Sequence, residues 1–258
     1  MLDTIIAAVR KSGNILLFAQ DIRSSVETKE GKANFVTKYD TAVQESLHRA
    51  LLEKYPGASF LAEEGDLHEQ GTGDVTFIID PIDGTTNFIK GLKKSCVSVG
   101  AAQGGEVVCG VIYNPFTAEM FYAVKGGGAF LNGQRIRAAS GGLADELVTF
   151  GTSPYNPEFI EKTYALTARM QAAALDVRRS GSAALDLCYV ACGRCGLFYE
   201  YQLSPWDFAA GSLIVTEAGG IASDMDGNPL PLSQKSSVLA GGPKVYEDFM
   251  QMEKTVKE

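Results

Sequence analysis

Two aspartates stand three residues apart in segment 79–88, whose sequence is IDPIDGTTNF. Asp80 ends an apolar run, and Asp83 follows a turn that Pro81 makes rigid because its ring fixes one backbone dihedral angle. Two negative charges at this spacing repel each other, so we expect a positive group from outside the sequence between them. Carboxylate oxygens on a rigid turn suit Mg²⁺ or Ca²⁺, and the turn leaves the carbonyl of Ile82 available as a further ligand.

The residues after Asp83 indicate an anion site beside this cation site. The sequence GTTNF has the form of a helix start, where exposed N–H groups and the hydroxyls of Thr85 and Thr86 favour a phosphate group. A metal ion next to a phosphate is the arrangement that hydrolyses phosphate esters. One alternative stays open, namely an aspartate-rich turn whose polar residues only cap the helix.

Two further acidic segments could complete a metal site. The sequence LAEEG places Glu63 and Glu64 at the end of another predicted strand, and SPWDFAAG places Asp207 in the first turn of a helix. Taken alone, each has an ordinary explanation: a solvated acidic pair, and a charge that is favourable near a helix N-terminus.

The composition is ordinary for a soluble globular protein and argues against several classes. Of the 258 residues, 45% are hydrophobic and 21% charged, and the net charge of −8 comes without a basic run that would mark a nucleic-acid surface. No apolar run reaches the roughly 18 residues that span a bilayer, and the N-terminus lacks the features of a secretory signal. We expect a cytoplasmic protein with no membrane partner and no direct nucleic-acid partner.

The five cysteines do not indicate a disulfide framework, because the count is odd and the chain has no recognisable leader. Cys192 and Cys195 form a CxxC, which could be a redox pair or half of a zinc site. No second CxxC exists, and the two histidines are His48 and His68. The favoured interpretation is a pair of small residues between a helix and a strand.

Periodicity and turn signals divide the chain near the segment SGGLADE. Residues 1–140 are predicted to contain two helices, one at 2–22 and one from Thr37 or Asp40 onward. They are also predicted to form a largely antiparallel sheet, with hairpin turns at Gly104-Gly105 and Asn132-Gly133. Residues 141–258 alternate strands with helices, including one that begins at Ser182 and one that begins at Pro205. This alternation predicts a layered α/β arrangement, with both parts forming one compact catalytic unit.

The segments FIIDPIDGTTNF and WDFAAGSLIVTEAGG together closely resemble the paired signatures of the inositol monophosphatase family. The intervening segments TKYD, LAEE, GGGAFLNG and RSGSAA fit in order and spacing, so the resemblance covers essentially the whole chain. It implies an αβαβα sandwich of the sugar-phosphatase type, dependence on Mg²⁺, sensitivity to lithium and a homodimer.

The resemblance also assigns roles to individual residues. It makes Glu63, Asp80 and the Ile82 carbonyl ligands of a first Mg²⁺, and Asp80, Asp83 and Asp207 ligands of a second. A third, weaker ion would lie near Glu63 and the segment KEGK at 29–32. Asp40 and Thr85, beside the catalytic Glu63, would orient the attacking water.

The substrate is expected to contact a further set of residues. The phosphate would bind at Gly84, Thr85 and Thr86, next to Asp83, with Lys29 approaching from the KEGK segment. The alcohol portion would face Gly181, Ser182, Ala183 and Glu200.

One departure from the family pattern is the basic sequence IKGLKKS after TTNF, with Lys90, Lys93 and Lys94. It is either a solvated surface or a second anion site that would favour a bisphosphate. The leading function is a Mg²⁺-dependent phosphomonoesterase acting on inositol monophosphate or a related polyol phosphate. The alternatives are a fructose 1,6-bisphosphatase, a 3′-phosphoadenosine nucleotidase, which Thr86 disfavours, and a regulatory protein on the same fold.

Overall fold

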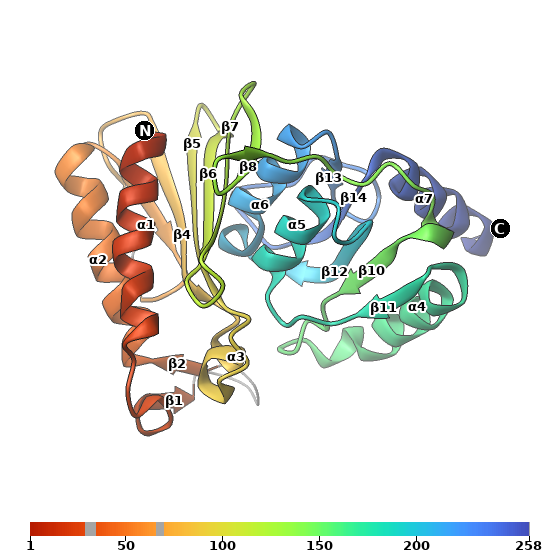
Figure 1. The fold of residues 1–258 in the computed structure, drawn as a ribbon, viewed down its shortest axis with the longest axis horizontal. Helices are drawn as coiled ribbons and strands as arrows, with labels where there is room; N and C mark the ends of the chain where they lie inside the picture. The colour runs from red at the N-terminus through yellow and green to blue at the C-terminus, as the bar shows by residue number, and fades with distance from the viewer. Residues whose placement is uncertain (29–34, 66–69, 258) are drawn as a thin grey trace.

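The computed structural model describes residues 1–28, 35–65 and 70–257 and shows five layers (Figure 1). Two helices, a sheet, two more helices, a second sheet and a last pair of helices follow one another across the molecule. The predicted αβαβα sandwich is therefore confirmed. In the described part of the chain, no helix is long and apolar enough to cross a membrane.

The first helix layer covers the outer face of a seven-stranded sheet. Helices α1 (Leu2–Leu17) and α2 (Lys38–Lys54) pack against each other and against this sheet. The strand order is β3-β4-β5-β6-β7-β8-β9, in which β3 and β4 are parallel and the other neighbours antiparallel. The strands are β3 (Ser59–Ala62), β4 (Val75–Asp83), β5 (Cys96–Gln103), β6 (Glu106–Asn114), β7 (Glu119–Val124), β8 (Gly128–Leu131) and β9 (Gln134–Arg135).

The predicted hairpin turns of this sheet are confirmed. Gly104-Gly105 joins β5 to β6, and Asn132-Gly133 joins β8 to β9, with positive φ at all four residues. Such φ values match the twist of paired strands in two-residue turns.

Two central helices lie between the sheets, namely α5 (Ala183–Ala191) and α6 (Pro205–Glu217), which begin where the sequence predicts. Helix α6 lies very close to the seven-stranded sheet because glycines face it. A Cβ atom on Gly110 would come within 2.7 Å of the Ala210 carbonyl oxygen, and one on Gly100 would lie 3.3 Å from the Ala209 Cβ atom. This close approach fixes where the first turn of α6, with Asp207, stands relative to β4.

The second sheet has the order β11-β10-β12-β14-β13. The strands β10 (Leu147–Phe150), β11 (Asp176–Arg178) and β12 (Leu197–Leu203) are parallel to one another, while β14 (Ser236–Gly241) pairs antiparallel with β12 and with β13 (Ile221–Ser223). Helices α4 (Ile160–Ala173) and α7 (Pro243–Lys257) cover its outer face, where Leu166, Met170 and Phe249 are buried.

A β-bulge interrupts strand β4 at the predicted aspartate pair. Asp80 pairs with Ser98 and Asp83 with Cys96, so three residue steps on β4 oppose two on β5. In a regular strand, residues three apart point to opposite faces, and one extra residue brings them to the same face. The strand was predicted to end at Asp80, but it continues through the bulge to Asp83. A similar irregularity separates Glu200 from Leu203 on β12.

Several short elements complete the chain. The first helix ends at Leu17 rather than near residue 22, and the polar segment that follows forms the 3₁₀ turn η1 (Ile22–Ser25) and the antiparallel strands β1 (Val26–Thr28) and β2 (Phe35–Thr37). The remaining short helices are α3 (Thr85–Lys90), η2 (Leu143–Asp145) and η3 (Pro157–Phe159). Lys29 and the KEGK segment, which were predicted to approach the phosphate and a third ion, lie outside the described residues.

We predict that Gly110→Ala lowers the free energy of unfolding by about 1–3 kcal/mol, the usual cost of overpacking a core. The added methyl group would meet the backbone of α6, which cannot rotate away. Gly100→Ala is the matched control, because its methyl group would lie 3.3 Å from the nearest atom, a tight contact that should nevertheless cost less than one at 2.7 Å. Urea unfolding of the three proteins measures this, and equal stability of Gly110→Ala and the parent would contradict the proposed backbone contact.

Candidate active site

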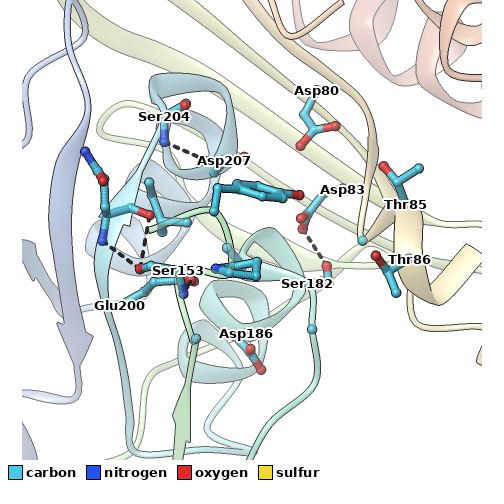
Figure 2. Close-up of a pocket in the computed structure, with 18 of the residues that line it drawn as sticks. Asp80, Asp83, Thr85, Thr86, Ser153, Ser182, Asp186, Glu200, Ser204 and Asp207 are labelled. Atoms are coloured by element: carbon cyan, nitrogen blue, oxygen red, sulfur yellow. Dashed lines mark hydrogen bonds between the residues drawn. The ribbon is translucent and has the colours of Figure 1, made fainter. Parts of the chain in front are cut away.

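A pocket of about 450 Å³ opens between the two sheets, where the first turns of several helices meet. Figure 2 shows Asp80, Asp83, Thr85 and Thr86 on one side, with Glu200, Ser153 and Asp207 across from them. The pocket brings together nearly all of the residues predicted from the sequence. Its lining includes Glu63, Asp80, Ile82, Asp83, Gly84, Thr85, Thr86, Gly181, Ser182, Ala183, Glu200 and Asp207.

Asp80 is a deeply buried carboxylate of the pocket, with 2% of its surface exposed. Its Oδ1 atom has no hydrogen-bond partner. Burial, and then the neighbouring carboxylates led by Glu63 and Asp83, raise the pKa of Asp80 well above its usual value. An unpartnered buried carboxylate oxygen is costly, so this atom fits a role as the ligand of a cation.

Asp83 is held by the start of helix α5. Its Oδ2 atom accepts hydrogen bonds from Ser182 Oγ at 2.5 Å and from the Ala184 backbone N–H at 2.7 Å, and Cys96 Sγ lies 3.7 Å away. Burial raises the pKa of Asp83, while these donors act in the opposite direction. The bonds fix the carboxyl group through one oxygen and leave Oδ1 for another partner.

Asp207 and Asp40 are each fixed at the start of their own helix. Asp207 Oδ2 accepts the backbone N–H of Ser204 at 2.7 Å, and Asp40 Oδ2 accepts both the N–H of Thr37 at 2.8 Å and its hydroxyl at 2.6 Å. Each is the N3 residue of a capping box. In this arrangement the N-cap side chain accepts the N3 backbone N–H, and the N3 side chain accepts the N-cap backbone N–H. Burial raises the pKa of Asp40 to about 6 and that of Asp207 well above its usual value.

Thr85 connects Asp40 to the pocket. Its hydroxyl lies 3.0 Å from the Ile82 carbonyl oxygen and 3.3 Å from Asp40 Oδ1, and both atoms accept hydrogen bonds. Asp40 itself does not line the pocket and acts on it through Thr85. The hydroxyl oxygen of Thr85 can therefore accept a bond from a water molecule while its hydrogen is donated to Asp40 or Ile82.

The donor chemistry of the pocket fits Mg²⁺, which prefers carboxylate and carbonyl oxygens. In the described part of the chain, however, no three acidic, histidine or cysteine side chains stand close enough together to enclose one ion. Asp83 and Asp207 are each anchored by a different helix, and mutual repulsion disfavours closer approach. The fit thus rests on the oxygen donors and on the unpartnered atom of Asp80.

The far side of the pocket is built around Glu200. Its Oε1 atom accepts the backbone N–H of Ser153 at 2.7 Å, and burial raises its pKa to about 7. Gly151 leaves room for this side chain, because a Cβ atom there would lie 1.8 Å from Glu200 Oε2. Ser182 was predicted to face the substrate alcohol, but its hydroxyl is engaged with Asp83 and only 2% of the residue is exposed.

Several supporting residues were not predicted from the sequence. The Gln44 side chain exchanges two hydrogen bonds with the backbone of Glu64, which positions the end of β3 beside Glu63. Asn87 Nδ2 donates to the carbonyls of Lys94 and Ser180, which ties α3 to the loop before α5. Such side chains were missed because a hydrogen bond to backbone far away in the chain leaves no pattern in the local sequence. Asn87 does lie within the motif IDPIDGTTNF.

The three lysines of the IKGLKKS segment do not belong to the pocket. Lys90, Lys93 and Lys94 are absent from its lining, whereas Arg179 and Lys235 contribute to it. The carbonyls of Lys93 and Lys94 accept hydrogen bonds from Asn114 and Asn87, which holds the backbone of this segment beside α3. The hypothesis that Lys93 or Lys94 binds a second phosphate is therefore not supported by their position.

Comparisons with known proteins agree with this site. The model of the inositol monophosphatase family matches residues 1–255. The chain is 38% identical over 252 residues to the Nus factor SuhB of Salmonella typhimurium, covering 97% of this chain and 94% of that protein.

Solved structures give the same result. An IMPase of Thermotoga maritima superimposes with a TM-score of 0.88 at 33% identity, covering 98% of this chain and 96% of that one. The extragenic suppressor protein suhB of Bartonella henselae gives 0.87 at 34% identity, with 96% of each chain covered.

The fold and the match over nearly the whole chain define the class, which is a family of phosphatases. The chain belongs to the inositol monophosphatase family. Its relatives carry two kinds of name, IMPase and SuhB, so the names of the relatives leave its activity open.

We predict that Asp80→Asn makes the metal-free protein more stable by about 1–3 kcal/mol at pH 8, because it removes a buried charge that no donor compensates. Mg²⁺ should stabilise the parent by binding the carboxylate, so that the difference in stability disappears. The variant should gain little stability from Mg²⁺. Urea unfolding in EDTA and in Mg²⁺ measures both effects. Asp74→Asn, at an exposed position, is the control. Asp80 would be excluded as a ligand if Asp80→Asn were less stable than the parent in EDTA and were still fully stabilised by Mg²⁺.

Proposed function

We propose that the protein is a Mg²⁺-dependent phosphomonoesterase that hydrolyses inositol monophosphate or a related polyol or sugar phosphate. The observation that carries this proposal is the convergence of Glu63, Asp80, Asp83 and Asp207 on one pocket, with a buried oxygen of Asp80 left without a partner. Membership of the inositol monophosphatase family supports it. A pocket of this size suits a small phosphorylated ring.

The metal ligands would be those expected from the sequence. Glu63, Asp80 and the Ile82 carbonyl would hold one ion, and Asp80, Asp83 and Asp207 a second, with a third, weaker ion near Glu63. Mg²⁺ bound there would supply an acidified water molecule and a counter-charge for the leaving oxygen. It would also offset the carboxylates, so that an acidic protein can accept an anionic substrate.

The chain's own residues would orient the reactants. Thr85 accepts a hydrogen bond from the attacking water while it donates to Asp40, which fixes the water toward phosphorus. The phosphate would rest on the turn at Gly84, whose φ of +84° and close approach to the Lys94 carbonyl exclude a side chain. Glu200 and the start of α5 would face the alcohol portion.

A regulatory role is a second candidate, because relatives 36–38% identical to the chain are named Nus factor SuhB. For the same reason, the expectation of no nucleic-acid partner gains no support from the comparisons. Residues of the pocket do not discriminate between the two functions. A regulatory role would persist in Asp83→Asn, whereas hydrolysis would not.

A phosphate-release panel tests the enzymatic proposal. With Mg²⁺, we expect release from inositol monophosphate to exceed release from fructose 1,6-bisphosphate and 3′-phosphoadenosine 5′-phosphate, and EDTA should abolish it. Asp83→Asn should remove most of the activity while the circular dichroism spectrum is retained. Undiminished turnover in that variant would exclude the two-metal assignment, and the absence of release from every ester would favour the regulatory role.

Thr85→Ala should lower kcat by roughly 10²-fold, the range for a proton relay that orients a nucleophile. KM should change less, because the phosphate-binding backbone remains. Steady-state kinetics with inositol monophosphate measures both constants. Thr85→Ser is the matched control, since it keeps the hydroxyl and should keep most of the activity; an effect on KM alone would reassign Thr85 to substrate binding.

A further inference from the structure

A four-residue turn stands at the mouth of the pocket between β10 and η3. The Asn156 N–H donates to the Ser153 carbonyl at 2.9 Å, which closes the turn and places Pro154 and Tyr155 at its two central positions. Ser153 has a φ of +41°, in the left-handed region that residues other than glycine rarely adopt. The turn is therefore a strained conformation that its surroundings must hold in place.

Three hydrogen bonds anchor this turn to the floor of the pocket. The Ser153 N–H donates to Glu200 Oε1 at 2.7 Å, and the Gln202 N–H donates to Ser153 Oγ at 3.1 Å. The backbone N–H of Gly151 donates to the Tyr199 carbonyl at 2.9 Å, which continues the pairing with β12. Tyr155 is thus presented by a rigid support and not by a loose loop.

Tyr155 lines the pocket, and 53% of the residue is exposed. A phenol carries its proton at neutral pH and can donate one hydrogen bond to a substrate. Trp206 and Leu203 also line the pocket and add apolar surface.

We propose that Tyr155 determines specificity for the alcohol portion of the substrate by covering a ring-shaped polyol and donating its O–H to it. An aromatic ring can pack against the C–H face of a cyclic polyol, and the phenol O–H can donate a hydrogen bond to one of the polyol hydroxyls. A short linear alcohol such as glycerol would cover much less of the ring. The inference deepens the proposed function and rests on it, because it names the residue that selects the alcohol portion of the substrate.

Kinetics of two variants and one control test the proposal. Tyr155→Ala should lower kcat/KM for inositol 1-phosphate by roughly tenfold or more, and for glycerol 2-phosphate by less than about threefold. Tyr155→Phe keeps the ring and should lose about threefold with inositol 1-phosphate, the value of one neutral hydrogen bond. Tyr164→Ala is the matched control, since Tyr164 on α4 is 56% exposed and does not line the pocket.

A binding measurement separates this proposal from the proposed activity. Calorimetric titration with the phosphonate analogues of both esters, which cannot be hydrolysed, gives dissociation constants whether or not the enzyme turns over. A tenfold loss in Tyr155→Ala confined to the inositol phosphonate supports the proposal even if no ester is hydrolysed, which would overturn only the proposed function. Equal losses with both ligands, or none with either, would overturn the role of Tyr155.

Discussion

Mutual repulsion among buried carboxylates is the constraint on which the rest of this structure depends. Three of these groups are stabilised in the same way, by a backbone N–H at the start of a helix. Asp40 accepts from Thr37 at α2, Asp207 from Ser204 at α6, and Asp83 from Ala184 at α5. A helix N-terminus carries partial positive charge, so each bond both fixes an oxygen and offsets part of its charge. Asp80 has no such donor for Oδ1, and this atom is therefore suited to bind a cation.

The layered fold follows from the need to bring these helix starts to one place. Helices α5 and α6 must begin beside the bulge of β4, so they lie between the two sheets. The glycines that face α6 allow the helix to approach the sheet closely enough for Asp207 to reach the pocket of Asp80. The bulge in turn directs both aspartates of β4 to one side, which a regular strand cannot do.

Local signatures in the sequence predicted the helix starts, the hairpins and the acidic turn, whereas the αβαβα layers and most of the pocket residues were implied by the resemblance to the inositol monophosphatase family. Ser182 and Pro205 mark helix starts, and the paired glycines mark hairpins, through the backbone conformations that they favour. The β-bulge was not predicted, since its signal is a change of register with β5 and not a pattern within β4. The roles of Ser182 and Gln44 were also missed, because each bonds a residue that is distant in sequence. The role proposed for Lys93 and Lys94 stays a prediction, since the direction of an exposed side chain leaves no signal in the local sequence.

The charge of the pocket also determines how its ligands depend on one another. The lining contains many carboxylates and two basic residues, Arg179 and Lys235, within a chain of net charge −8. A phosphate ester is repelled by such a surface unless cations are bound, and cations are held more tightly when the ester adds its own oxygens. Thermodynamic linkage requires these two effects to be equal. If bound substrate raises the affinity for the cation by a given factor, bound cation raises the affinity for the substrate by the same factor. In the proposed function, the carboxylates that repel one another in the metal-free chain would therefore be the groups that make substrate binding conditional on the cation.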